Sequence, residues 1–351
     1  MRTVFWDYNS NQLNMIDQRL LPSTFEIAVF DDYHNVAKAI TDMVVRGAPA
    51  IGAAAAFGLA LAAIKSKATS FEELRRELNT AADLLLQSRP TAINLHWAIH
   101  RVLSHIPGSC NDVDELRQFI LNEAQAIADE DIEINKRMAK NGAQLIQDGD
   151  TIIHHCNTGA LATVDWGTAL GVIRMAHDQG KHIHVLVDET RPRLQGARLT
   201  AWELSQYKIP YDIITDNAAG YFLHSGQVQK VLFGADRVAS NGDVANKIGT
   251  YMLALAAFDN NVPAFSVVPT STIDLSLNTG NLIPIEERPQ AEVLDITIAE
   301  RKVSPEGATA KNPAFDITPN RLITGIITEN GIVYPPYDEN LQKVVITTTK
   351  P

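Results

Sequence analysis

The chain has 351 residues, of which 45% are hydrophobic and 20% charged, values that suit a folded globular protein of two domains and exclude a disordered or fibrous one. Forty-one acidic residues against thirty basic ones give a formal net charge of -11, which excludes binding to nucleic acid or to an anionic membrane through bulk charge. An anionic ligand must therefore meet a local cluster of basic groups.

Two cysteines, Cys110 and Cys156, are too few for a disulfide framework and are typical of a reducing compartment. The N-terminus reads MRTVFWDYNSNQL and lacks the apolar core of a signal peptide. The longest apolar run, Ala48–Ile64, is rich in small residues and interrupted by proline and glycine, so it predicts a packed interior helix and not a membrane span. We therefore expect a cytoplasmic protein that binds no membrane.

The first part of the chain begins with strand-like segments at Val4–Tyr8, Leu13–Asp17 and Thr24–Phe30. From Tyr33 the apolar residues recur with a helical period. Further helices are predicted from Pro49, where proline suits a first turn, and over Phe71–Ser88, Asn94–Ser104 and Asp114–Asn141. This pattern predicts short strands followed by a helical bundle.

Beyond Gly149, strand-like runs alternate with helix-like ones. The predicted strands are Thr151–His155, His182–Asp188, Tyr211–Thr215, Lys230–Ala235 and Ala264–Val268, with Ile323–Thr328 and Gly331–Val333 as late additions. The predicted helices are Thr168–Gln179, Gly196–Tyr207, a short one ending near His224, and Asn246–Phe258. This βαβαβ rhythm predicts an α/β protein. We expect a smaller N-terminal β/helical domain over 1–135 and a Rossmann-like parallel-sheet catalytic domain over 136–351.

Ligands of an open parallel sheet bind beyond the carboxyl ends of its strands. Cys156 follows the first predicted strand, in a loop near a predicted helix N-terminus, which favours a thiolate or proton transfer. A buried, inert thiol is the alternative, and it is our interpretation of Cys110. Asp236 follows the apolar strand that ends at Ala235, where burial would favour a protonated carboxyl able to act as a general acid. A turn cap paired with Arg237 is the alternative for Asp236.

Basic groups for an anion are found at two predicted helix starts. Arg46, Gly47 and Ala48 precede Pro49, so exposed backbone N–H groups would lie beside an arginine there. A C-cap glycine next to a solvated arginine is the alternative. Arg89 precedes a further helix in the same way.

Polar groups in the second part of the chain complete the candidate set. Gln195 belongs to the dense polar loop Asp188–Arg198 at a predicted strand end. Asn246 and Lys247 are predicted to begin a helix and offer an amide and an ammonium group. Together with the two arginine motifs, these residues are suited to hold one phosphate and several hydroxyls.

Several common sites are excluded. The chain has neither a GxGxxG dinucleotide fingerprint after a strand nor a GxxxxGK[ST] P-loop. His96 and His100 have i, i+4 spacing without an HExxH motif, and we interpret them as packed or solvated side chains. His154 and His155 are adjacent in a strand and face opposite sides, so they cannot chelate one ion, although either could tune Cys156. We expect no metal.

Long segments of the chain resemble motifs of the methylthioribose-1-phosphate isomerases, in the order found in that family. These segments are Arg46–Gly52, Arg89–Leu95, Cys156–Thr163, Asp188–Leu204, Gly234–Arg237, Asn241–Thr250, Ile283–Arg288 and Asn312–Asp316. The resemblance covers nearly the whole chain. Thr158 and Phe57 depart from it, because the family more often has alanine and tyrosine at these positions.

The resemblance implies an aldose–ketose isomerase that converts 5-methylthioribose 1-phosphate to 5-methylthioribulose 1-phosphate in methionine salvage. It implies Cys156 and Asp236 as catalytic residues and no metal or organic cofactor. The implied substrate-binding residues are Arg46, Gly47, Ala48, Arg89, Gln195, Asn246 and Lys247. It further implies a sugar phosphate as the only small-molecule partner and a homodimer formed through the second domain.

Two other functions belong to the same superfamily: ribose-1,5-bisphosphate isomerase, and a regulatory subunit of the guanine-nucleotide exchange factor for translation initiation. The regulatory subunits are binding proteins, so the fold alone cannot decide between an enzyme and a binding protein. The presence of both Cys156 and Asp236 favours an isomerase. The Arg89 motif and the N-terminal β region more closely resemble the methylthioribose branch.

Overall fold

A computed structural model describes residues 1–90 and 92–346 of the chain. It divides into two compact units, Met1–Lys136 with Thr158–Gly167, and Arg137–Asn157 with Thr168–Pro351. We predicted two contiguous domains, 1–135 and 136–351, and therefore placed Thr158–Gly167 in the second domain, whereas the structure groups this segment with the first unit. The division of the chain into these two domains stays a prediction. Thr91, part of the Arg89 motif, lies outside the described residues.

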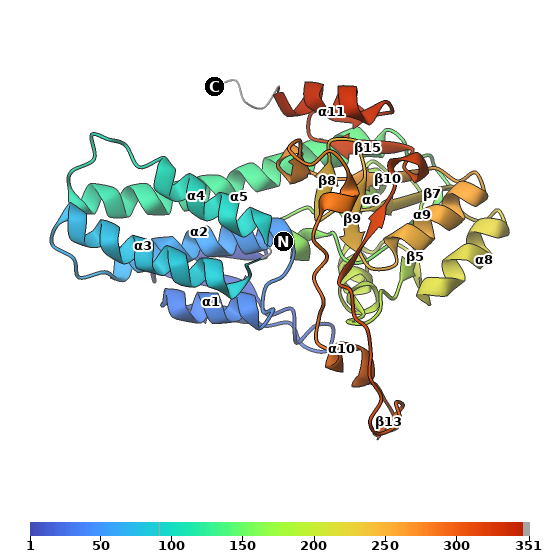
Figure 1. The fold of residues 1–351 in the computed structure, drawn as a ribbon, viewed down its shortest axis with the longest axis horizontal. Helices are drawn as coiled ribbons and strands as arrows, with labels where there is room; N and C mark the ends of the chain where they lie inside the picture. Colours follow the sequence, from blue (N-terminus) through green and yellow to red (C-terminus); the bar gives the residue numbers. More distant parts are fainter. Residues whose placement is uncertain (91, 347–351) are drawn as a thin grey trace. The chain divides into compact units, whose positions relative to one another are not determined.

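The first unit contains a small antiparallel sheet and a layer of helices (Figure 1). The sheet has the order β1-β2-β3, with strands β1 (Val4–Asp7), β2 (Gln12–Ile16) and β3 (Ile27–Phe30). The helices are α1 (Tyr33–Thr41), α2 (Ala48–Lys65), α3 (Phe71–Ser88), α4 (Ile93–Ser104) and α5 (Val113–Ala143), whose last turns belong to the second unit. A short 3-10 turn, η1 (Ala160–Ala162), belongs to the same unit. The predicted strands-plus-helices architecture is confirmed.

Helix α2 is the core element of the first unit. Its 18 residues are long and apolar enough to cross a membrane by length and composition, yet 78% of them are buried inside the protein. Small side chains allow this burial, because a Cβ at Gly52 would lie 2.9 Å from the backbone oxygen of Asn94 on α4. A helix that is apolar all round is stable in water only when other elements cover it. The interpretation of this run as a packed interior helix agrees with the structure.

The second unit is built on a seven-stranded sheet with the order β16-β15-β10-β7-β4-β5-β6, in which only β16 runs antiparallel to its neighbour. Its strands are β4 (Thr151–His154), β5 (His184–Asp188), β6 (Tyr211–Ile214), β7 (Lys230–Phe233), β10 (Ala264–Val267), β15 (Gly325–Thr328) and β16 (Gly331–Val333). The helices α6 (Ala169–Asp178), α7 (Ala201–Tyr207), α8 (Ala219–His224) and α9 (Thr250–Asp259) connect them. This confirms the predicted Rossmann-like sheet.

The order of these strands contains a topological switch point. From β4 the chain proceeds to β5 and β6 on one side, and then returns to place β7 on the other side of β4. In folds of this kind, the loops that leave the two strands at the switch point diverge, and ligands bind beyond the carboxyl ends of these strands.

A second, four-stranded sheet was not predicted. It has the order β11-β8-β9-β14, with strands β8 (Arg237–Ala239), β9 (Val244–Lys247), β11 (Ile273–Asp274) and β14 (Phe315–Thr318). Asn246 and Lys247 thus end a strand, and the prediction that they begin a helix is wrong. The next helix starts only at Thr250, after Gly249 with its left-handed φ of 102°.

The remaining elements are short. They are a hairpin of β12 (Thr297–Ile298) and β13 (Arg301–Lys302), the helices α10 (Ala291–Leu294) and α11 (Tyr337–Ile346), a π-helical turn η2 (Gly196–Thr200), and the 3-10 turns η3 (Asp216–Ala218), η4 (Thr270–Thr272), η5 (Gly280–Leu282) and η6 (Asn320–Leu322).

Candidate active site

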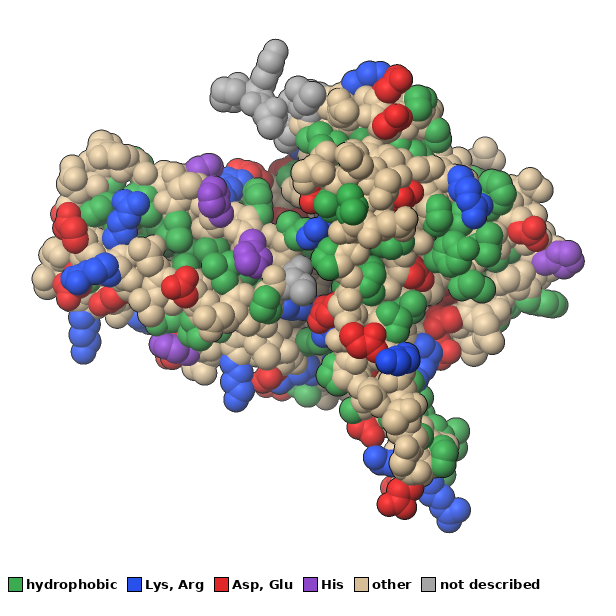
Figure 2. Space-filling view, in the orientation of Figure 1, with side chains coloured by type: hydrophobic (Ala, Val, Ile, Leu, Met, Phe, Trp, Pro, Cys, Tyr) green, Lys and Arg blue, Asp and Glu red, His purple; other side chains and the backbone are tan. Residues whose placement is uncertain are grey.

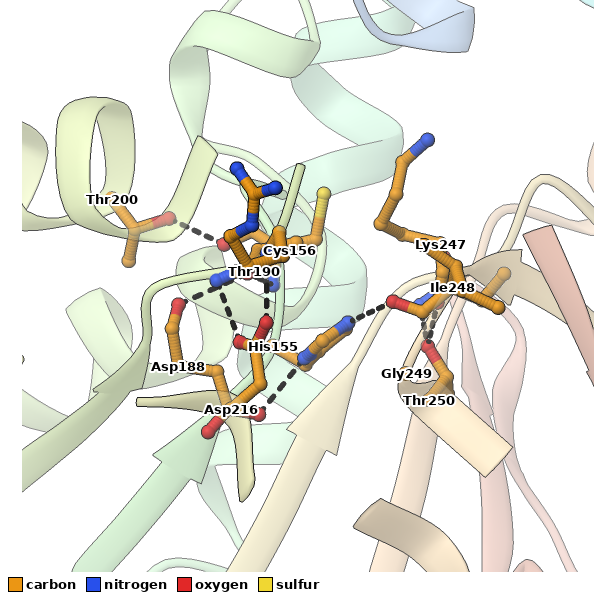
Figure 3. Close-up of polar contacts among 12 residues, drawn as sticks. His155, Cys156, Asp188, Thr190, Thr200, Asp216, Lys247, Ile248, Gly249 and Thr250 are labelled. Carbon is orange, nitrogen blue, oxygen red and sulfur yellow. Dashed lines mark hydrogen bonds and ion pairs between the residues drawn. The ribbon is translucent and has the colours of Figure 1, made fainter. Parts of the chain in front are cut away.

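Cys156 lies two residues beyond β4 and is 5% exposed. Its backbone has a left-handed φ of 65°, a conformation that costs free energy for a residue other than glycine. Two hydroxyls hold it there: the Cys156 N–H donates to Thr190 Oγ1 at 2.9 Å, and Thr200 Oγ1 donates to the Cys156 carbonyl at 2.7 Å (Figure 3). Strain that is over-determined in this way is typical of functional positions.

The residue after Cys156 is anchored by a buried acid. Asn157 donates its amide to Glu203 Oε1 at 2.8 Å and to Thr200 Oγ1 at 3.2 Å, and Glu203 is fully buried in α7. The expected helix N-terminus beside Cys156 is absent from the described residues, since the segment continues to the 3-10 turn η1 and not to an α-helix. Side-chain hydroxyls and amides, and not a helix dipole, therefore organise this loop.

Asp236 follows β7, and its N–H donates to the carbonyl of Ala245 on β9 at 2.9 Å. Because β4 and β7 are hydrogen-bonded neighbours, Cys156 and Asp236 follow the two strands that flank the switch point. The strand before Asp236 is buried, but the Asp236 side chain is exposed, so the expected burial of this carboxyl is wrong. The chain turns outward at Ala235 because the next residues join the second sheet.

Gln195 lies in the loop after β5, immediately before the π-helical turn η2. Its side chain is 8% exposed, and its Oε1 accepts no hydrogen bond within the described residues. The following Gly196 is required sterically, because a Cβ there would lie 1.7 Å from the carbonyl oxygen of Asp188. A π-turn with an unsatisfied buried amide oxygen is typical of a binding position.

Asn246 and Lys247 are presented by the end of β9. Asn246 is buried and donates to Thr250 Oγ1 at 2.9 Å. Lys247 Nζ donates to the carbonyl of Ala314 at 2.9 Å and lies 4.6 Å from the centre of the Phe315 ring. Figure 3 shows the Cys156 and Lys247 side chains pointing to the same side of their loops. The second unit thus brings a thiol and an ammonium group to one edge of the sheet.

A buried histidine–aspartate pair next to Cys156 was not identified as a site from the sequence. His155 Nδ1 is 2.8 Å from Asp188 Oδ2, and both side chains are 1% exposed. Burial opposes the charge on His155, but the hydrogen bond and charge of Asp188 raise its pKa above the ordinary value. Burial, and to a lesser extent the charge of His155, lower the pKa of the adjacent His154 to about 3. The signal in the sequence was Asp188 at a strand end, beside the pair His154 and His155.

These groups do not form a convincing metal site. The ligand atoms of His155, Asp188 and Asp216 lie within 4.8 Å of one another. However, the second ring nitrogen, His155 Nε2, faces the Ile248 carbonyl at 3.0 Å, and the two oxygens of Asp216 accept the N–H groups of Thr190 and Arg191 at 2.7 Å each. A metal would need an unprotonated ring nitrogen directed at it, whereas both nitrogens here face oxygen acceptors.

The remaining predicted residues lie at one end of the helical layer of the first unit. Gly47 is the N-cap of α2, with a φ of 96°, so it is not the C-cap considered as the alternative. A Cβ at Gly47 would lie 2.3 Å from the carbonyl oxygen of Ala162, so glycine is required. Arg46 and Ala48 flank Gly47. Arg89 is the C-cap of α3, and a short connection joins α3 to the preceding α2. The unit thus combines a helix N-terminus with two arginines, as an anion site requires.

An open cleft of about 280 Å³ lies behind the turn that carries Lys247. Its lining residues are Arg191, Pro192, Asp216, Ile248, Gly249, Val293, Lys311, Asn312 and Pro313. None of the predicted site residues belongs to this lining, although Ile248 and Gly249 directly follow Lys247.

Comparisons with known proteins agree with this fold. The sequence matches the initiation factor 2 subunit family over residues 44–335. It is 51% identical to the methylthioribose-1-phosphate isomerase of Acetivibrio thermocellus over 96% of this chain and 98% of that one. The crystal structure of 5-methylthioribose 1-phosphate isomerase from Pyrococcus horikoshii OT3 has a TM-score of 0.92 at 47% identity and covers 99% of this chain and 96% of its own.

The crystal structure of a protein named translation initiation factor eIF-2B, subunit delta, from A. fulgidus has a TM-score of 0.89 at 43% identity, with 99% of both chains covered. Names within this fold therefore include both enzymes and translation factors. The chain belongs to the initiation factor 2 subunit family, with its high-identity curated relatives among the methylthioribose-1-phosphate isomerases.

Proposed function

We propose that the protein is an aldose–ketose isomerase that converts 5-methylthioribose 1-phosphate to 5-methylthioribulose 1-phosphate, a step of methionine salvage. The observation that carries this proposal is the position of Cys156 and Asp236, which follow the neighbouring strands β4 and β7 at the switch point. The relatives named as this isomerase, about half identical over nearly the whole chain, support the same reaction.

The chemistry explains why two groups are needed. Phosphate on the anomeric oxygen prevents the ring from opening as a free hemiacetal does, so an acid must protonate the ring oxygen as its bond to C1 breaks. Asp236 is the acid in this proposal. Because its carboxyl is exposed in the free protein, the negative charge of the bound phosphate, and not burial, would favour its protonated form. The hydrogen on C2 then moves to C1, and the C2 hydroxyl proton leaves as the ketone forms. The product is an isomer, so no oxidant or reductant is consumed.

Cys156 serves one of two routes for the hydrogen. In the first, its thiolate removes a proton from C2, and the thiol returns a proton to C1 of the phosphoenolate. In the second, the hydrogen moves from C2 to C1 as hydride, and Cys156 positions the reacting carbons. A reaction in deuterium oxide separates the routes. Deuterium at C1 of the ketose supports proton transfer, whereas a product without it supports hydride transfer.

The substrate phosphate and hydroxyls are assigned to the remaining residues. Lys247 offers an ammonium group directed to the same side as Cys156, and Gln195 has an amide oxygen with unused acceptor capacity. The assignment of Arg46, Gly47, Ala48 and Arg89 to substrate binding rests on the half-buried N-terminus of α2, where the N-cap glycine has no side chain to cap the helix, and on the family resemblance. Arg89→Met should raise KM by about 10-fold or more, as expected for loss of one charge-assisted contact.

The test is a product assay with purified protein and no added cofactor. Turnover of 5-methylthioribose 1-phosphate, with ribose 1,5-bisphosphate as the competing substrate, supports the proposal. Preference for the bisphosphate would assign the other isomerase activity. Failure with both sugars would favour a binding subunit, in keeping with the name of the A. fulgidus neighbour.

The same proposal includes a homodimer formed through the second unit. Helix α9 is apolar, yet Met252 is 65% and Phe258 55% exposed, and Tyr221 on the adjoining α8 is 69% exposed. Figure 2 shows hydrophobic side chains gathered over this region. An exposed apolar patch of this kind is typical of a subunit interface.

The double variant Met252→Glu with Phe258→Glu should therefore be monomeric in ultracentrifugation. The control Ile298→Glu, on the hairpin, should remain a dimer. A parent protein that is monomeric at micromolar concentration would contradict the assignment.

A cytoplasmic location is also part of the proposal. Both Cys110 and Cys156 are free thiols, which suits a reducing compartment. Fractionation of cells should find the protein with soluble cytoplasmic markers, and its recovery from a membrane or secreted fraction would contradict this assignment.

A further inference from the structure

The ring of His155 joins the Cys156 loop to the end of β5 and to the turn before α9. Its Nδ1 meets Asp188 Oδ2 at 2.8 Å, and its Nε2 meets the Ile248 carbonyl at 3.0 Å. The ring is 1% exposed, so neither contact competes with water. Two segments far apart in the sequence are thus connected through one imidazole.

The turn at Ile248 is held closely against this ring. A Cβ on Gly249 would lie 2.9 Å from His155 Cε1, so the backbone approaches the imidazole as only glycine allows. On its other side the turn is fixed by Asp316, whose carboxylate accepts the N–H groups of Gly249 at 2.7 Å and Tyr251 at 3.1 Å. Lys247 directly precedes the turn, so the position of its backbone follows from these contacts.

On its other side, the His155 ring is connected to Cys156 through Asp188 and Thr190. Asp188 ends β5, and its carbonyl accepts the hydroxyl of Thr190 at 3.0 Å. The same hydroxyl accepts the N–H of Cys156 at 2.9 Å. The chain of contacts therefore runs from Cys156 through Thr190 and Asp188 to His155, and on to the turn that follows Lys247.

We propose that His155 is a positioning residue, which holds the Lys247 turn in register with the Cys156 loop through its hydrogen bonds to Asp188 and to the Ile248 carbonyl. Figure 3 shows Cys156 and Lys247 directed to the same side, with the His155 ring below them in the view. The inference rests on the proposed function, because it assigns Lys247 to the substrate of Cys156.

Both ring nitrogens face oxygen atoms, so each carries a proton when Asp188 is ionised. Burial raises the pKa of Asp188 to about 6, which leaves it mainly ionised at pH 7. The pKa of His155 is raised above its ordinary value, because the hydrogen bond and charge of Asp188 and the charge of Asp216 favour the charged ring against its burial. The Asp316 carboxylate and the adjacent His154 ring also interact with the charge of His155. A charged His155 beside a neutral His154 is a spectroscopic signature that a neutral packing residue would not produce.

Two variants separate the two contacts of the ring. An asparagine amide nitrogen occupies the place of Nδ1, so His155→Asn keeps the contact with Asp188 and loses that with Ile248. A glutamine amide nitrogen occupies the place of Nε2, so His155→Gln keeps the contact with Ile248. We expect His155→Asn to raise KM by roughly 10-fold and lower kcat/KM by about 100-fold, as a misplaced binding group does. His155→Gln should recover most of the KM.

The matched control is His184→Gln, because His184 forms the same kind of pair with Asp212 at 2.9 Å, but its side chain is 38% exposed. Thermal unfolding identifies any variant that fails to fold. Nitrogen-15 spectra of the ring of His155 in the parent provide a test that needs no variant, with both nitrogens expected to be protonated at pH 7.

The outcomes are distinguishable. An active parent with equal KM in folded His155→Asn and His155→Gln, or a His155 ring with one unprotonated nitrogen, overturns the positioning role alone. A parent that neither turns over nor binds 5-methylthioribose 1-phosphate in calorimetry overturns the proposed function and this inference together. Selective recovery of KM by His155→Gln, with an unchanged His184→Gln, supports the inference.

Discussion

The two ends of the parallel sheet each carry a histidine–aspartate pair, and the pairs differ in what surrounds them. At the carboxyl end, His155 and Asp188 are each 1% exposed and connect two loops. At the amino end, the side chains of His184 and Asp212 are 38% and 73% exposed and connect only the neighbouring strands β5 and β6. The same residue types, at similar distances, therefore lie in different surroundings.

The difference follows from the direction of the strands. In a parallel sheet all carboxyl ends lie at one edge, and the loops leaving them diverge at the switch point. Polar side chains from several loops meet at that edge, where they can face a ligand. At the amino edge, ion pairs such as that of Lys230 with Asp150 at 2.6 Å stabilise the fold. We therefore expect changes at the carboxyl edge to alter catalysis and changes at the amino edge to alter stability.

The largest effect is expected for Cys156→Ser. A hydroxyl has nearly the size of the thiol but is far less acidic, so turnover should fall about 1000-fold or more while the fold is retained. Steady-state assays beside thermal unfolding measure both quantities. Cys110→Ser, the matched control in the first unit, should behave as the parent. Near-normal turnover in Cys156→Ser would remove the thiol from the mechanism.

The second largest effect is expected for Asp236→Asn, which should reduce turnover roughly 100- to 10,000-fold and leave substrate affinity nearly unchanged. The amide keeps the shape of the carboxyl but has no acid proton to give to the ring oxygen. Calorimetry with substrate, beside the turnover rate, measures the two effects separately. Weak binding with normal turnover at saturation would mean that Asp236 only contacts a sugar hydroxyl.

At the amino edge, Lys230→Met should reduce the free energy of unfolding by about 3 kcal/mol and leave kcat unchanged, because it strands a buried carboxylate. The Asp150 side chain is 5% exposed, and its Oδ2 also accepts the N–H of Gln147 at 2.8 Å. Adding Asp150→Asn should restore most of the stability, since the amide oxygen can still accept that N–H. Denaturant titration measures both, and a fall in kcat would contradict the separation of the two edges.

The smallest effect concerns pH. His154 has a folded-state pKa lowered to about 3 from 6.5, because burial disfavours its charge. The unfolded chain therefore binds more protons below pH 6.5, and stability should fall by about 2 kcal/mol between pH 6.5 and pH 5 through this group. Denaturant titrations across this range should show the fall in the parent and in His184→Gln, and a smaller one in His154→Leu. Equal slopes in all three proteins would show that His154 is charged in the fold.

Elements with a strong local pattern were predicted closely. Helix α3 has the predicted bounds Phe71–Ser88, because its apolar residues recur with a helical period after the N-cap Ser70. The strands of the main sheet agree within a few residues for the same reason. The second sheet was missed because its strands, such as β8 with three residues and β11 with two, are too short to show alternation.

The sequence by itself determined which side chains lie at strand ends, since apolar runs set the strands and the residues after them are polar. It thereby identified Cys156, Asp236 and the polar loop that contains Gln195. Only the tertiary structure decided that Asn246 and Lys247 end a strand, that Asp236 is exposed, and that His155 pairs with Asp188 while His154 stays neutral. The physical reason is that burial, pairing and charge depend on contacts between residues far apart in the chain, which a local pattern does not specify.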